Sequence, residues 1–161
     1  MPLTIQGQLL RELDVVARSA ATATELMREI VTRLAELPNY NWVGFYMIER
    51  GGPGEPEQML VLGPFVGAET PHQRIPLNRG ICGAAAASGK TIIVDNVRSD
   101  PRYLACSIET KSEIVVPVFA YGRVVGELDI DSHAPASFSG SDRELVEACA
   151  VLLGLYLEHH Q

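Results

Sequence analysis

The sequence IVVPVFAYGRVVGELDI, residues 114–130, decides the fold of this chain. Two runs rich in β-branched residues, Ile114 to Phe119 and Arg123 to Ile130, flank the dipeptide Tyr121-Gly122, which is typical of a tight turn. Strands joined by so short a connection pair antiparallel. We therefore predict a β-hairpin within an antiparallel sheet.

The flanking sequence predicts helices at both ends of this sheet. Residues 4 to about 37 have apolar residues at helical spacing, in two helices, and Thr22 with Glu25 fits a capping box for the second. Ser141 with Glu144 predicts the same device at the start of a terminal helix. Between them we expect strands at 42–48, 59–62, 73–77 and 91–94, a short helix at 80–88 and a loop at 96–107. The result is an α+β protein, a single domain over residues 1–161, with a central antiparallel sheet and the N- and C-terminal helices on one face.

Composition excludes several classes of function. The chain has 161 residues and a net charge of -7, and its basic residues are scattered, so we expect no nucleic-acid partner. The longest strongly apolar run, residues 148–157, is too short to span a bilayer, and no signal peptide is visible. Three cysteines are an odd number, unlike a secreted disulfide framework. We expect a cytoplasmic protein with reduced thiols.

Carboxylates alternate along the second strand of the hairpin. Glu127, Asp129 and Asp131 share one face of that strand, while Leu128 and Ile130 face the core. The simplest interpretation is a solvated face. The alternative is a cation site, because carboxylates at this spacing repel and a metal, a basic side chain or a ligand ammonium relieves the repulsion. Histidines are sparse, so we predict no transition-metal site.

Two cysteines have surroundings that suit thiol chemistry. Cys106 lies in the predicted loop with Arg102 before it and Lys111 after it, which favours a reactive thiolate. Cys82 lies near the start of the predicted helix at 80–88, where the helix N-terminus stabilises a thiolate. For both residues, burial as a small apolar side chain is the alternative. Cys149 aligns with apolar residues of the terminal helix, so we assign it to packing.

Aromatic residues begin the strand predicted at 42–48. Trp42, the only tryptophan, and Tyr46 lie on the same face of that strand. Aromatic side chains with a polar edge suit a pocket for an amphipathic ligand, although most aromatic residues in strands belong to the core.

Several of these segments together resemble a known family. The segments NWVGFY (41–46), LVLGPF (60–65), RGICG (79–83), SEIVVP (112–117) and LDIDS (128–132) are similar to free methionine-(R)-sulfoxide reductase, a stand-alone GAF-domain enzyme. The resemblance covers roughly residues 40–158. It implies a GAF fold, which is often dimeric.

The resemblance also implies roles for individual residues. Cys106 matches the catalytic cysteine and Cys82 a resolving cysteine, whereas His72 stands where the family has a third cysteine. Glu113, Asp129 and Asp131 match the substrate-binding carboxylates, and Trp42 and Tyr46 match the aromatic pocket. Glu127 receives no role from the family.

The implied reaction is the reduction of free L-methionine-R-sulfoxide to methionine. A Cys106 thiolate attacks the sulfoxide sulfur and becomes a sulfenic acid, which Cys82 converts to a disulfide. A thioredoxin-type dithiol then reduces that disulfide, and no cofactor is required. The partners are thus free methionine sulfoxide, a thioredoxin-type reductant and a second copy of the chain. We expect the homodimer to form through the terminal helices, because the last one carries Leu145, Leu152, Leu153 and Tyr156.

Two other functions fit the same residues. A GAF-type module could bind a small ligand without turnover, and the His72 substitution favours this reading. A redox sensor could use the same thiols to switch a partner protein. Turnover of methionine sulfoxide distinguishes the enzyme from both.

Overall fold

The computed structural model describes residues 4–104 and 107–160. In chain order the elements are α1 (Ile5–Ser19), α2 (Ala23–Leu34), β1 (Trp42–Arg50), β2 (Gln58–Val66), β3 (Arg74–Pro76), α3 (Gly80–Ser88), β4 (Ile92–Val94), the 3₁₀ turn η1 (Val97–Ser99), β5 (Ser112–Ala120), β6 (Arg123–Ser132) and α4 (Gly140–His159). The predicted hairpin is β5–β6. The predicted strand at 59–62 is longer than expected and runs from Gln58 to Val66.

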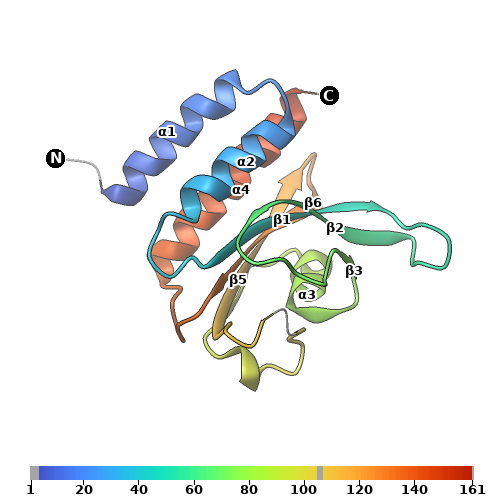
Figure 1. The fold of residues 1–161 in the computed structure, drawn as a ribbon. Coiled ribbons are helices and arrows are strands. Elements are labelled where there is room, and N and C mark those ends of the chain that lie inside the picture. Colours follow the sequence, from blue (N-terminus) through green and yellow to red (C-terminus); the bar gives the residue numbers. More distant parts are fainter. Residues whose placement is uncertain (1–3, 105–106, 161) are drawn as a thin grey trace.

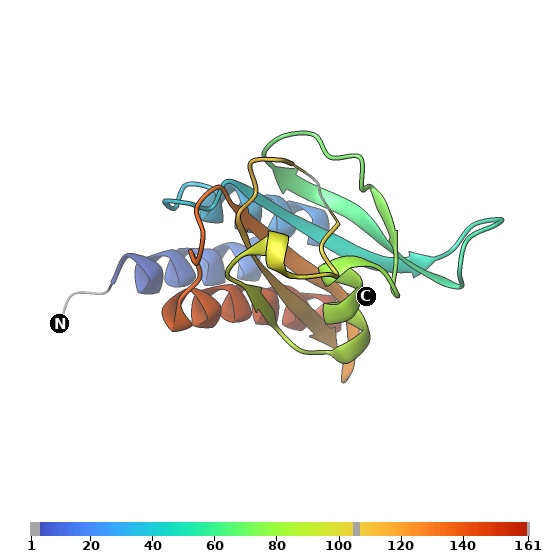
Figure 2. The ribbon, with the colours of Figure 1, turned by 90° about the horizontal axis from the view of Figure 1, so that it is seen from below.

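All neighbouring strands pair antiparallel in one sheet of order β3-β2-β1-β6-β5-β4. Helices α1, α2 and α4 lie on one face of this sheet, and α3 with the loops around it lies on the other (Figure 1). The view from below shows the same separation (Figure 2). The predicted position of both terminal helical segments on one face is therefore confirmed.

Each face of the sheet has its own apolar core. Alternate residues of β1, β5 and β6, such as Phe45, Ile114 and Leu128, pack against α1, α2 and α4. Residues of opposite parity, such as Tyr46 and Val115, pack with Ile81 and Ala85 of α3 in the second core. Because successive side chains of a strand point to opposite faces of the sheet, the carboxylates of β6 face α3 and not the three long helices.

The start of α4 differs from the prediction. Ser139, not Ser141, is the N-cap: its hydroxyl accepts from the backbone N–H of Asp142, and the Asp142 carboxylate accepts from the backbone N–H of Ser139. Tyr40 holds this register, because its hydroxyl donates to Asp142 over 2.6 Å and its ring packs on Phe138. At α2 the hydroxyl of Thr22 caps the helix as predicted, although Glu25 accepts from Ala21 and so does not complete a capping box.

The residues predicted to form a dimer interface are mostly internal. Leu145, Leu153 and Tyr156 are buried in the core beneath α4, and the Tyr156 hydroxyl donates to the carbonyl of Ala20. These side chains are therefore not available to a second copy. Cys149 is buried in the same core, as predicted, and burial raises the pKa of its thiol to about 12. Among the described residues, no helix combines the length and apolar character needed to cross a bilayer.

Candidate functional site

Four carboxyl groups meet on the α3 face of the sheet. Glu127, Asp129 and Asp131 of β6 share that face, and β5 adds Glu113, which pairs directly with Asp131 in the strand register. On the other side of β6, Trp42 of β1 pairs with Asp131 and Tyr46 pairs with Glu127. Strand pairing alone thus assembles the acidic and aromatic residues that the sequence predicted.

These carboxyl groups are buried, so the interpretation as a solvated face is wrong. Their exposed fractions are 5% for Glu113, 0% for Glu127, 3% for Asp129 and 4% for Asp131. None of them forms an ion pair with Lys, Arg or His among the residues that the structure describes. Within the same part of the chain, both oxygens of Glu127 and the Oδ1 atoms of Asp129 and Asp131 have no hydrogen-bond partner.

The pKa values of these groups reflect this environment. Burial, and then the charges of Asp129 and Asp131, raise the pKa of Glu113 well above its usual value. Burial likewise raises the pKa of Glu127 and of Asp131, with Asp129 adding to both shifts, and it raises the pKa of Asp129 itself. Without a positive partner, this site retains protons that exposed carboxylates would lose.

Cys82 faces the carboxyl groups from the first turn of α3. Its Sγ donates to Oδ2 of Asp129 over 3.4 Å, and the side chain is only 7% exposed. Burial, followed by the charges of Asp129, Glu127 and Glu113, raises the pKa of the thiol well above its usual value. The predicted stabilisation of a thiolate by the helix N-terminus is therefore outweighed, and Cys82 is a thiol here.

The ligating atoms of Cys82, Glu113 and Asp129 form a compact cluster. One Sγ and two carboxyl oxygens all lie within 4.8 Å of one another, and all three residues are buried. These are the described residues whose geometry suits a cation.

A cavity of about 80 Å³ opens beside Asp131. Trp42 and Asp131 line it together with residues of the 68–70 and 107–110 segments and His133. The indole Nε1 donates to the carbonyl of Ala68, and the ring stacks on Tyr46 and Phe65 with centroids 6.3 and 5.6 Å away. Trp42 thus forms a wall of the cavity. Tyr46 does not line the cavity but packs against the Trp42 ring, and its hydroxyl donates to the carbonyl of His72 over 2.6 Å.

Cys106 lies outside the described residues, so its predicted reactivity and its approach to Cys82 remain predictions. The described residues on either side of it contact the site. Leu104 lies against Gly80 at the start of α3, where a Cβ would come within 2.9 Å of its side chain, and Ser107 lines the cavity beside Asp131. Arg102, which we expected to favour a thiolate, is paired with Asp100 through a 2.7 Å contact.

Sequence reasoning missed two residues around this cavity. Glu109 and Thr110 line it, and Glu109 pairs with His133 at 3.5 Å. Their position in the loop directly after Cys106 was the available signal. Glu127 receives no role from the family resemblance, although it alternates with Asp129 and Asp131 in the sequence.

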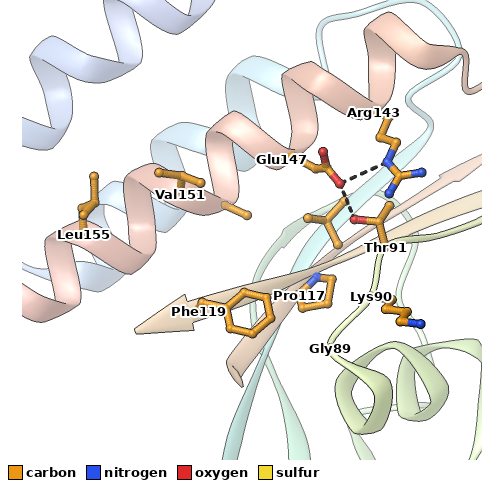
Figure 3. Close-up of a pocket in the computed structure, with 11 residues that line it drawn as sticks. Gly89, Lys90, Thr91, Pro117, Phe119, Arg143, Glu147, Val151 and Leu155 are labelled. Atoms are coloured by element: carbon orange, nitrogen blue, oxygen red, sulfur yellow. Dashed lines mark hydrogen bonds and ion pairs between the residues drawn. The ribbon is translucent and has the colours of Figure 1, made fainter. Parts of the chain in front are cut away.

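A larger cavity lies elsewhere. A groove of about 550 Å³ runs between α4 and the edge formed by β4 and β5, with Phe119, Val151 and Leu155 along it (Figure 3). At its other end Glu147 accepts from Thr91 and Arg143. The groove shares no residue with the cavity beside Asp131, and its lining includes neither a cysteine nor a buried carboxylate. The thiol and carboxyl chemistry therefore points to the smaller cavity.

Comparison with known proteins gives the class of the fold. The family model described as GAF domain matches residues 22–157. The predicted α+β GAF fold, an antiparallel sheet with the terminal helices on one face, is confirmed.

Closer relatives narrow the class to an enzyme family. A free methionine-R-sulfoxide reductase from Neisseria meningitidis, solved in complex with its substrate, is 34% identical with a TM-score of 0.87, over 96% of this chain and 89% of that one. A type II enzyme from Thermoplasma acidophilum is 38% identical with a TM-score of 0.76, over 91% and 96%. The free methionine-R-sulfoxide reductase of Saccharomyces cerevisiae is 40% identical, over 70% of this chain and 61% of its own length. The chain belongs to the GAF domain family and, within it, to the free methionine-R-sulfoxide reductases.

Proposed function

We propose that this protein reduces free methionine-R-sulfoxide to methionine, with Asp129, Asp131 and Glu113 binding the substrate's ammonium group. One observation carries the proposal: Asp131 lines a cavity and belongs to a group of buried carboxyl residues that have no basic partner among the described residues. A substrate ammonium supplies the missing positive charge. The family membership supplies the reaction.

The ammonium group explains why the substrate is free methionine sulfoxide. An ammonium group would let these carboxylates ionise by compensating their charge in the buried site. A methionine sulfoxide within a peptide has an amide in place of this ammonium. It would leave the carboxylates unpaired in an enclosed site, which is costly. Trp42 would pack on the methyl sulfoxide end of the substrate.

Cys106 is the proposed nucleophile. Its sulfur attacks the sulfoxide sulfur and forms an S–S bond. This bond and the S–O bond of the substrate then break as the oxygen is transferred to Cys106, which becomes a sulfenic acid that carries the former thiol proton. The sulfoxide sulfur is reduced by two electrons, Cys106 is oxidised by two, and methionine leaves. A protonated carboxyl, such as those that burial maintains in this site, is suited to assist the sulfoxide oxygen.

Cys82 is the proposed resolving residue. Its thiol sulfur displaces hydroxide from the Cys106 sulfenic acid, and the thiol proton joins the hydroxide to leave as water. Asp129 accepts a hydrogen bond from this thiol and is placed to take the proton. A thioredoxin-type dithiol then reduces the disulfide. A thiol cycle of this kind suits a reducing compartment, so we also propose the cytoplasm.

Cysteine variants test this order of events. Cys106→Ser should abolish the first turnover. Cys82→Ser should complete one stoichiometric turnover and stop, leaving a sulfenic acid that a dimedone-type probe traps. Normal cycling of Cys82→Ser with thioredoxin would make Cys82 structural. Turnover by Cys106→Ser would move the nucleophile to Cys82.

A homodimer is the remaining proposal from the sequence, and its interface must now use exposed residues. Val151 and Leu155 of α4 are 56% and 48% exposed, and Phe119 of β5 is 48% exposed beside them (Figure 3). A patch of this kind on α4 supports an interface between two copies of the terminal helix.

A further inference from the structure

The cluster of Cys82, Glu113 and Asp129 has dimensions close to those of a metal centre. Zinc lies about 2.3 Å from a thiolate sulfur and about 2.0–2.2 Å from a carboxylate oxygen, so two tetrahedral ligands are separated by roughly 3.3–3.8 Å. The three donor atoms here are within 4.8 Å of one another. Small rotations of side chains, without movement of the strands, would bring them into contact with one ion.

The oxygens around this cluster form a second, independent observation. Asp129 Oδ1 and both oxygens of Glu127 are buried and have no hydrogen-bond partner among the described residues. Buried polar atoms of this kind are normally paired. A cation held by Cys82, Glu113 and Asp129 would compensate them.

The donor set selects the kind of cation. Mg²⁺ and Ca²⁺ bind six or more oxygen ligands and disfavour sulfur. A thiolate with carboxylates suits a borderline-soft divalent ion such as Zn²⁺, which accepts four ligands. Our sequence-based prediction of no transition-metal site counted histidines, whereas the donors in this site are a thiol and carboxyl groups.

We propose that the reduced, substrate-free protein binds one thiophilic divalent cation of the zinc class at Cys82, Glu113 and Asp129. The ion would occupy the carboxylates assigned to the substrate's ammonium and bind the thiol assigned to resolution. Cation and substrate therefore exclude each other, and the ion holds the enzyme inactive. Only this exclusion rests on the proposed function, because binding of the ion requires no turnover.

Cobalt provides the probe. Co²⁺ added anaerobically to the fully reduced protein should give the near-ultraviolet thiolate-to-cobalt charge-transfer band with a stoichiometry of one, and Zn²⁺ should remove the band by displacement. Cys149→Ser is the matched control, because Cys149 is buried in the opposite core, and this variant should keep the band. Cys82→Ser should lose it and weaken Zn²⁺ binding, measured by calorimetry, by at least about tenfold.

A second variant separates the site from the thiol alone. Glu113→Gln should keep a charge-transfer band but weaken Zn²⁺ binding by at least about tenfold as well. Absence of the band in the wild type, or a band that persists in Cys82→Ser, would overturn the proposal. Unchanged affinity in Glu113→Gln would do the same. Enzyme turnover is measured separately on metal-free protein, so failure of the proposed activity and failure of the metal site give different results.

Discussion

At the scale of single residues, acidic side chains on the same face of one strand differ in whether they reach the cavity. Asp131 lines the cavity, whereas Glu127, four residues earlier on the same face, is fully buried and does not line it. The two residues occupy equivalent alternating positions in the sequence, so the pattern alone could not distinguish them. The difference depends on where α3 and the following loop cover the strand, and this is a tertiary property.

Asp131→Asn should impair substrate use and leave folding intact. The change is nearly isosteric and removes one of several mutually repelling carboxyl groups, so the free energy of unfolding should stay constant or rise. Loss of a hydrogen bond between charged partners, about 1.5–3 kcal/mol, predicts a fall of about 10- to 100-fold in kcat/KM. Steady-state kinetics with free methionine-R-sulfoxide measure it.

The control for this variant is Glu57→Gln, since Glu57 is exposed. It removes the same charge from the protein without touching the site and should keep the wild-type kcat/KM. If Asp131→Asn also keeps the wild-type kcat/KM, Asp131 does not bind the substrate's ammonium group.

Tyr40→Phe should destabilise the protein in a pH-dependent way. Burial acts to raise the pKa of Asp142, but hydrogen bonds from Tyr40 and Ser139 outweigh it and leave this pKa lowered. A lowered folded-state pKa contributes stability above the unfolded pKa, and this stability is lost as pH falls through the folded pKa. Urea unfolding at neutral pH should show a loss of about 1–2 kcal/mol.

The same measurement below the folded pKa of Asp142 should show a smaller difference between Tyr40→Phe and the wild type. A difference that does not change with pH would mean that the charge of Asp142 contributes nothing to this contact.

At the scale of elements, strands and helices could be predicted because their periods differ. The alternation in residues 123–130 and the turn at Tyr121-Gly122 were sufficient for the hairpin β5–β6. The ends of elements were harder to predict. Ser139 and Ser141 each precede an acidic residue by three positions, so the sequence offered two equivalent caps, and the contact of Tyr40 with Asp142 selects Ser139.

The extension of β2 has a similar explanation. The predicted strand ended at Leu62, directly before Gly63 and Pro64, and Pro cannot donate to a ladder. In the structure they lie where the register with β1 shifts between Gly44 and Tyr46, so the missing N–H of Pro64 costs no paired hydrogen bond.

Gly154→Ala should destabilise the protein, although Gly154 lies within a helix, where this change is usually favourable. Alanine is usually favoured over glycine in a helix by up to about 1 kcal/mol. A Cβ at position 154 would lie 2.1 Å from the carbonyl oxygen of Phe119, so α4 and β5 would have to separate. We expect a loss of about 1–3 kcal/mol in chemical denaturation, as for other overpacked cores.

Gly140→Ala is the control on the same helix. A Cβ at position 140 meets no atom within 4 Å, so this variant should be neutral or slightly more stable. Equal stability of the two variants would contradict the close approach of α4 to β5.

At the scale of the whole molecule, the site exists because three separate segments enclose one face of the sheet. Strand β6 brings the carboxylates, α3 brings Cys82 and the loop before β5 brings Ser107 and Thr110. Sequence reasoning identified the residues but not their burial, because burial requires knowing that α3 crosses this face. The same limitation applies to the proposed dimer, since apolar residues on α4 divide between the core and the surface.

Val151→Asp combined with Leu155→Asp should convert a dimer to a monomer. Each change puts a charge on the exposed apolar face of α4 and leaves the buried residues of the helix intact. Light scattering at micromolar concentration should give twice the chain mass for the wild type and the chain mass for the variant. A monomeric wild type would refute the dimer.

The most direct test of the central claim is the consumption of NADPH in the presence of the protein, thioredoxin, thioredoxin reductase and free methionine-R-sulfoxide. We predict that NADPH is consumed in proportion to the methionine formed, with little consumption when the S epimer or a peptide-bound sulfoxide is supplied. If the protein binds free methionine-R-sulfoxide but NADPH consumption does not exceed the protein-free background, the chain is a binding module and the account of its thiol chemistry is wrong.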